Sequence, residues 1–196
     1  MPRFLQNPSF PADIIRACWM LFFVIWMLAA ISNKRSIYRE SSAQRLRYSI
    51  LLVLAYLLLT NPRRLPYPFA VRIIPAAEAV EWMAAILCIA GFAFCVWARA
   101  TLGRNWSGTI TLKEGHELIE RGPYCLVRHP IYTGMLAMFL ATAIAIGHLG
   151  GVVGLAVAFA SFWIKLSDEE TLMRQQFPEQ YRSYEQRVKR IIPFVL

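Results

Sequence analysis

The sequence has only four cysteines, and no two of them form a CxxC pair. This pattern argues against a zinc site and against a disulfide framework. Cys18, Cys88 and Cys95 lie within apolar runs, where we expect them to be small packing residues. The sequence also shows no internal repeat and no low-complexity tract. A length of 196 residues fits one domain, residues 1–196.

Acidic residues are scarce, since 12 Asp and Glu stand against 21 Lys and Arg and the formal net charge is +9. Such an excess could suit nucleic acid, but here the cations lie between apolar runs. Hydrophobic residues make up 57% of the chain, and the mean hydropathy is +0.43, above what a soluble domain usually shows. We therefore expect the partner to be a lipid bilayer and no nucleic acid, with the cations following anionic headgroups and the positive-inside rule.

Five apolar runs approach the roughly 20 residues that a helix needs to cross a bilayer. They cover residues 14–31, 45–60, 75–99, 131–149 and 151–166. No small-residue cleavage site follows the first run, which predicts a membrane helix rather than a signal peptide. Only a short glycine-containing stretch separates the last two runs, so they should form a tight antiparallel hairpin.

Five crossings place the two termini on opposite sides of the membrane, and charge predicts which side is which. Sixteen Lys and Arg fall on the side that holds residues 34–47, 99–128 and the C-terminal segment, and five fall on the other. The positive-inside rule then predicts an outside N-terminus, and a cytosolic C-terminus and active site.

The C-terminal tail is polar but periodic. The fifth helix is expected to continue to about residue 176, and Phe177, Tyr181, Tyr184 and Val188 then follow at spacings of four, three and four. Pro178 suits the first turn of this second, amphipathic helix. The expected fold class is all-α: a polytopic membrane protein with about five transmembrane helices and cytosolic C-terminal helices.

A turn signal, Gly122-Pro123-Tyr124, precedes a polar motif that opens the fourth apolar run. The motif reads Arg128-His129-Pro130-Ile131-Tyr132-Thr133-Gly134. With Pro130 at the first helical position, the following N–H groups and the helix dipole can bind an anion such as a carboxylate. Arg128 and His129 could add donors, and Gly134 would let a ring or helix approach closely. Taken alone, such residues are also common interface anchors.

Three further groups of residues are candidates for a site. Lys165 and Glu169 stand four apart on one helical face, and Glu170 follows. Glu169 could bind a ligand ammonium, or it could only bridge Lys165 on a solvated surface. Residues 111–119, which include Lys113 and His116, could edge a nucleotide pocket. Residues 104–107, which include Arg104, could be an interfacial anchor or a pocket wall.

Together these pieces resemble the isoprenylcysteine carboxyl methyltransferase family and the wider group of membrane methyltransferases that includes phospholipid N-methyltransferases. The resemblance covers residues 98–194 and includes the Gly122 and Arg128 motifs, Glu169-Glu170, Phe177-Pro178-Glu179-Gln180-Tyr181 and Ile192-Pro193-Phe194. It implies S-adenosylmethionine as cofactor, S-adenosylhomocysteine as product, and a lipidated, prenyl-like molecule or peptide as acceptor. The oligomeric state is left open.

The resemblance also implies roles for single residues. Glu169 would hold the methionyl amino group of the cofactor, and Lys165 lies where the eukaryotic enzymes place an arginine near the substrate carboxylate. Arg104 or Arg128 could orient the acceptor with Lys165. The resemblance implies that the cofactor is bordered by His116, Leu118, Ile119, Tyr124, His129, Pro130 and Tyr132. We also expect Lys113, Gly134 and Glu170 to border it. Alternatives are methylation of a phospholipid amine, an NADPH-dependent membrane reductase, and a non-catalytic membrane protein.

Overall fold

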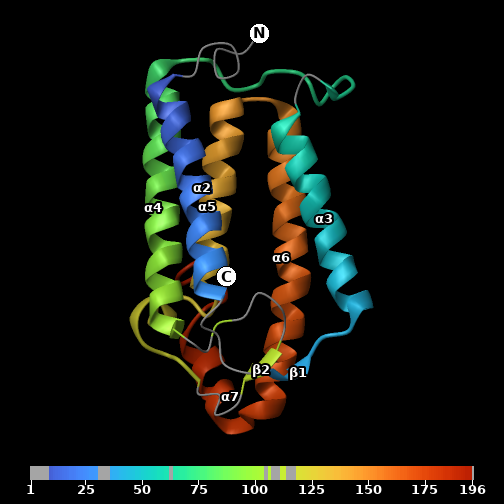
Figure 1. Ribbon diagram of the computed structural model, residues 1–196, viewed down its shortest axis with the longest axis vertical. Coiled ribbons are helices and arrows are strands. Elements are labelled where there is room, and N and C mark those ends of the chain that lie inside the picture. The colour runs from blue at the N-terminus through green and yellow to red at the C-terminus, as the bar shows by residue number, and fades with distance from the viewer. Residues whose placement is uncertain are drawn as a thin grey trace.

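Five long helices lie side by side in the computed structural model, which describes residues 9–30, 36–61, 64–103, 106, 111–113 and 118–195 (Figure 1). They are α2 (Phe10–Ala30), α3 (Ser42–Thr60), α4 (Glu78–Leu102), α5 (Pro130–Ile146) and α6 (Leu149–Gln176). Four of them are long and apolar enough to cross a membrane, and α5 is a shorter apolar helix of 17 residues. The expected all-α, polytopic membrane architecture is therefore confirmed.

The shorter elements gather at one end of the bundle (Figure 1). They are β1 (Ser36–Arg39), β2 (Thr111–Lys113), the 3₁₀ helix η3 (Gly122–Cys125) and α7 (Pro178–Arg187). The β1–β2 antiparallel ribbon has no counterpart among the elements expected from the sequence. The three polar segments that the charge count groups together thus share one end, while the loop between α3 and α4 meets the α5–α6 turn at the other.

Local sequence sets several helix boundaries. Helix α3 begins three residues before the apolar run because Ser41 and Gln44 form a reciprocal capping box. Helix α5 begins with Pro130 at its first position and ends at Gly147, whose φ of +73° favours glycine. Helix α6 is 28 residues long in all, about 42 Å. It continues past its apolar part to Gln176, as expected.

Small residues let the helices approach closely. A Cβ atom on Gly134 of α5 would lie 2.5 Å from Cys95 Sγ and 2.6 Å from the carbonyl oxygen of Gly91, both on α4. On the other side of the bundle, a Cβ on Gly154 of α6 would lie 3.0 Å from the Ala55 carbonyl oxygen of α3. Buried Cys18, Cys88 and Cys95 join the core between α2, α4 and α5, as packing residues should.

Candidate active site

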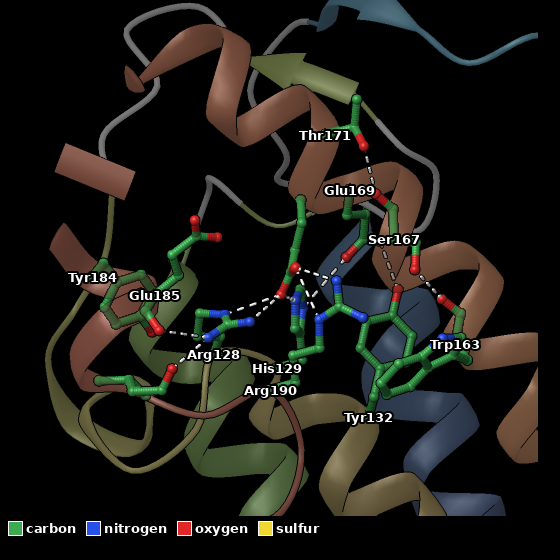
Figure 2. A network of polar contacts seen from close by, with 12 residues as sticks. Arg128, His129, Tyr132, Trp163, Ser167, Glu169, Thr171, Tyr184, Glu185 and Arg190 are labelled. Atoms are coloured by element: carbon green, nitrogen blue, oxygen red, sulfur yellow. Dashed lines mark hydrogen bonds and ion pairs between the residues drawn. The ribbon is translucent and has the colours of Figure 1, made fainter. Parts of the chain in front are cut away.

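Glu169 lies at the end of the bundle that carries α7, on the part of α6 beyond its apolar run. Its Oε1 accepts a hydrogen bond of 2.7 Å from the Tyr132 hydroxyl, and its Oε2 lies 3.7 Å from His129 Nδ1 (Figure 2). Its side chain is 24% exposed. Two residues from the start of α5 therefore hold a carboxylate of α6 that still faces solvent.

Glu170, the next residue, is fully buried among four cationic or ionisable side chains. Its Oε1 accepts hydrogen bonds from Arg128 at 2.8 and 3.0 Å and lies 3.1 Å from His129 Nε2. Its Oε2 accepts from Arg190 at 2.6 and 2.9 Å and from Arg174 at 3.2 Å. Both oxygens are thus engaged inside the protein. This differs from the cofactor contact suggested by the sequence and assigns Glu170 to the framework of the site.

Arg128 belongs to the same framework. Its side chain is only 9% exposed. The guanidinium donates to Glu170, to the carbonyl oxygen of Glu185 in α7 and to that of Val188 just after α7. These contacts direct Arg128 toward the C-terminal segment rather than toward the exposed side of Glu169. The structure therefore does not support the role in orienting an acceptor that the sequence suggests for Arg128.

The C-terminal segment runs along the start of α5. The backbone N–H groups of Arg128 and His129 donate to the carbonyl oxygens of Lys189 at 2.7 Å and Arg190 at 3.0 Å. The Thr133 hydroxyl donates to the carbonyl oxygen of Ile191 at 2.7 Å. Arg190, on the same segment, lies beside His129 and donates to Glu170 (Figure 2). The end of the chain thereby fixes the polar motif that opens α5.

Lys165 lies one turn before Glu169 on α6. Its Nζ is 5.7 Å from the ring centroid of Tyr132 and 5.1 Å from that of Tyr48 on α3. Tyr132 therefore contacts Glu169 through its hydroxyl and Lys165 through its ring. Four residues of helix separate the Cα atoms of Lys165 and Glu169 by about 6 Å along the axis.

Aromatic and aliphatic side chains border this end of the bundle. Tyr124 is buried against Ile131, with Ile119 and Leu102 packed beside it. Leu118 packs against Tyr181, Tyr184 and Val188, the buried face predicted for α7. Burial raises the pKa of Tyr124 and Tyr184, so the Tyr184 hydroxyl stays protonated and donates to the Tyr124 carbonyl oxygen at 2.6 Å.

Other expected site residues lie elsewhere or outside the described part. Gly134 is buried between α4 and α5, where it allows the close approach of a neighbouring helix that the sequence suggests. Pro130 is fully buried at the start of α5. Arg104 and His116 lie outside the described residues, and only the backbone of Lys113 is described, in β2.

Sequence reasoning missed several residues that the structure brings to the site. Arg174 and Arg190 count in the sequence only as positive charges of the tail, and Glu40 and Tyr48 belong to the N-terminal half, which carries no motif. The periodicity of α7, with Pro178 at its start, indicates a folded tail. It does not indicate where that tail docks.

The fold and site define a class of protein: a polytopic helical membrane protein with a charged and aromatic site at one end of its bundle. The family model "Phospholipid methyltransferase" matches residues 80–180. The chain belongs to this family. The matched residues include Tyr124, His129, Tyr132, Lys165 and Glu169, but not α3.

Several relatives and one solved structure are similar to this chain. A probable protein-S-isoprenylcysteine O-methyltransferase of Oryza sativa subsp. indica is 29% identical over 119 residues, 59% of this chain and 62% of its own length. Protein-S-isoprenylcysteine O-methyltransferase B of Arabidopsis thaliana is 33% identical over 98 residues, 48% of this chain and 50% of its own. The chain thus spans less than two thirds of these relatives.

The structural match extends over nearly the whole chain. A eukaryotic intramembrane Ras methyltransferase, isoprenylcysteine carboxyl methyltransferase, superposes with a TM-score of 0.63 and 19% sequence identity. The superposition covers 99% of this chain and 71% of that protein. At this identity the likeness describes the fold, including the arrangement of α2 and α3 that lies outside the family match.

Proposed function

We propose that this protein transfers the methyl group of S-adenosylmethionine to the carboxylate of an isoprenylcysteine-like lipid. The observation that carries the proposal is the partly exposed Glu169 carboxylate, held by Tyr132 and His129 at one end of a membrane bundle. The names of the relatives, protein-S-isoprenylcysteine O-methyltransferases, support the choice of acceptor.

The residues present fit this cofactor. S-adenosylmethionine carries an ammonium and a sulfonium, and when bound it supplies the methyl group. Glu169 would pair with the ammonium, since a charge-assisted hydrogen bond needs an accessible anion. Leu118, Ile119 and Tyr124 would border the rest of the cofactor on the side of α7 and η3.

Lys165 would orient the acceptor. It lies nearer than Glu169 to the apolar part of α6, so an anionic headgroup whose tail stays in lipid would meet Lys165 first. A carboxylate is already ionised at pH 7, and its methylation therefore needs no general base. The protein would act by aligning the two reactants and by excluding water from their charges.

We further propose that the end of the bundle carrying α7 faces the cytosol and that the N-terminus lies outside. The excess of Lys and Arg in the segments at that end supports this orientation.

A transfer assay with radiolabelled methyl donor tests the proposed function. The purified protein would be offered an S-farnesylcysteine analogue and phosphatidylethanolamine in parallel. The proposal predicts label in the first, released by base but not by acid, as an ester would be. Label in the phospholipid, with a rate that rises at basic pH as an amine loses its proton, would instead favour the alternative that the family's name suggests.

A further inference from the structure

Tyr48 of α3 is a buried tyrosine that is held at three points. Its hydroxyl donates to Glu40 Oε1 at 2.5 Å, and its carbonyl oxygen accepts from the Ser161 hydroxyl of α6 at 2.7 Å. Its ring lies under Lys165, with Nζ 5.1 Å from the ring centroid. Tyr48 therefore connects the N-terminal half of the chain to the one cation that the proposed function assigns to the acceptor.

Glu40, which anchors this ring, is itself buried just before α3, with a side chain 1% exposed. Arg45 Nε lies 3.6 Å from the same Oε1 that accepts the Tyr48 hydroxyl. Burying a carboxylate costs free energy unless partners stabilise it, and the Tyr48 hydroxyl and Arg45 are such partners. The effect of Glu40 is to fix the direction of the Tyr48 ring.

Lys165 thus lies over two rings that are anchored in the same manner. Tyr132 donates to Glu169 at 2.7 Å and Tyr48 donates to Glu40, while each presents its ring to the ammonium. Aromatic faces attract a cation at such distances. They also restrict a lysine side chain, which is otherwise flexible and lacks the rigid donor fork of arginine.

We propose that Tyr48 and Glu40 are positioning residues that hold the Lys165 ammonium where the acceptor carboxylate binds. This rests on the proposed function, and it adds the N-terminal half of the chain to a site whose proposed cofactor and acceptor residues, Glu169 and Lys165, lie within residues 80–180. The rings of Tyr48 and Tyr132 frame the compact ammonium of Lys165, which suits a small anionic headgroup such as a carboxylate.

Two measurements in detergent with an S-farnesylcysteine analogue test this proposal. A titration without turnover gives the Kd of the acceptor, and a methyl-transfer assay gives its KM. Tyr48→Leu removes the ring but leaves the Ser161 bond to the backbone. We expect its Kd and KM for the acceptor to rise about tenfold, the loss of one good cation–π contact. Its affinity for S-adenosylhomocysteine should stay within twofold of wild type, about the resolution of such titrations.

Conservative variants separate positioning from folding. Tyr48→Phe and Glu40→Leu each keep the ring but remove its anchor, so both should raise the acceptor KM by the same smaller factor, about threefold. Combining Tyr48→Leu with Lys165→Gln should weaken acceptor binding no further than Lys165→Gln alone, since both changes remove one interaction. Tyr56→Leu, on an exposed part of α3, is the matched control.

An unchanged acceptor Kd in Tyr48→Leu, or additive losses in the double variant, would overturn the proposal. The proposal would also be overturned if Tyr48→Leu lost as much affinity for S-adenosylhomocysteine as for the acceptor and unfolded at a lower temperature. That result would indicate a structural role only. Because binding is measured without turnover, the two proposals can fail separately. A protein whose affinity for the farnesylcysteine analogue depends on Tyr48 as expected, but which transfers no methyl group, would contradict the proposed function alone.

Discussion

His129 lies between two adjacent carboxylates, with Nδ1 3.7 Å from Glu169 Oε2 and Nε2 3.1 Å from Glu170 Oε1. The two glutamates follow one another on α6, yet one is partly exposed and the other fully buried. Successive residues of a helix point about 100° apart, so one faces the proposed cofactor site and the other the framework. This division leads to distinct predictions for the two side chains.

Replacing Glu170 should unfold the site, whereas replacing Glu169 should not. Glu170→Gln leaves Arg128, Arg174 and Arg190 without their shared counter-charge, and breaking a buried ion pair from one side costs about 3–5 kcal/mol. We expect a large fall in the thermal unfolding midpoint in detergent. Glu169→Gln should unfold close to wild type, since its side chain is partly exposed. Equal midpoints for the two variants would contradict the division of roles.

The contact between α4 and α5 should not tolerate a side chain at Gly134. Gly134→Val places atoms where Cys95 Sγ and the Gly91 carbonyl oxygen already lie, and overpacking of this kind costs about 1–3 kcal/mol or more. Thermal unfolding should therefore begin at a lower temperature. Adding Cys95→Ala should restore part of the loss, because the closest atom is then removed. Leu140→Val, on an exposed face of the same helix, should have little effect.

Much of the fold follows from the sequence because long apolar runs can satisfy their backbone hydrogen bonds in a membrane only as helices. The α5–α6 hairpin, the continuation of α6 to Gln176 and the buried face of α7 all agree with periodicity, proline and glycine positions. The first helix extends beyond the predicted limit at its start, to Phe10, because residues preceding an apolar run can still be helical.

The site was harder to predict because its contacts join residues far apart in the chain. Pairs such as Glu170 with Arg190 or Lys165 with Tyr48 leave no local pattern. The sequence predicts the same cofactor-binding role for Glu169 and Glu170, because their adjacency does not show which of the two side chains is buried. Only the docking of the C-terminal segment beside α5 shows that Arg128 and Glu170 stabilise each other inside the protein.

The proposed orientation in the membrane can be tested with the protein's own thiols. Cys125 is exposed at the end that carries η3 and α7, while Cys18, Cys88 and Cys95 are buried. A membrane-impermeant maleimide should label Cys125 in inside-out vesicles and not in intact cells. A cysteine introduced by Glu78→Cys, at the opposite end of the bundle, should show the reverse in a Cys125→Ser background. Labelling of Cys125 in intact cells would place α7 outside.

The central claim, that Glu169 pairs with the ammonium of the cofactor, is tested most directly by removing that ammonium. Calorimetric titrations would compare S-adenosylhomocysteine with its deaminated analogue on the wild type, Glu169→Gln and the exposed control Glu179→Gln. We expect the wild type and the control to bind the intact compound about 10- to 100-fold more tightly, the value of one charge-assisted hydrogen bond. Glu169→Gln should bind both compounds equally. A Glu169→Gln protein that kept the wild-type preference would contradict the claim.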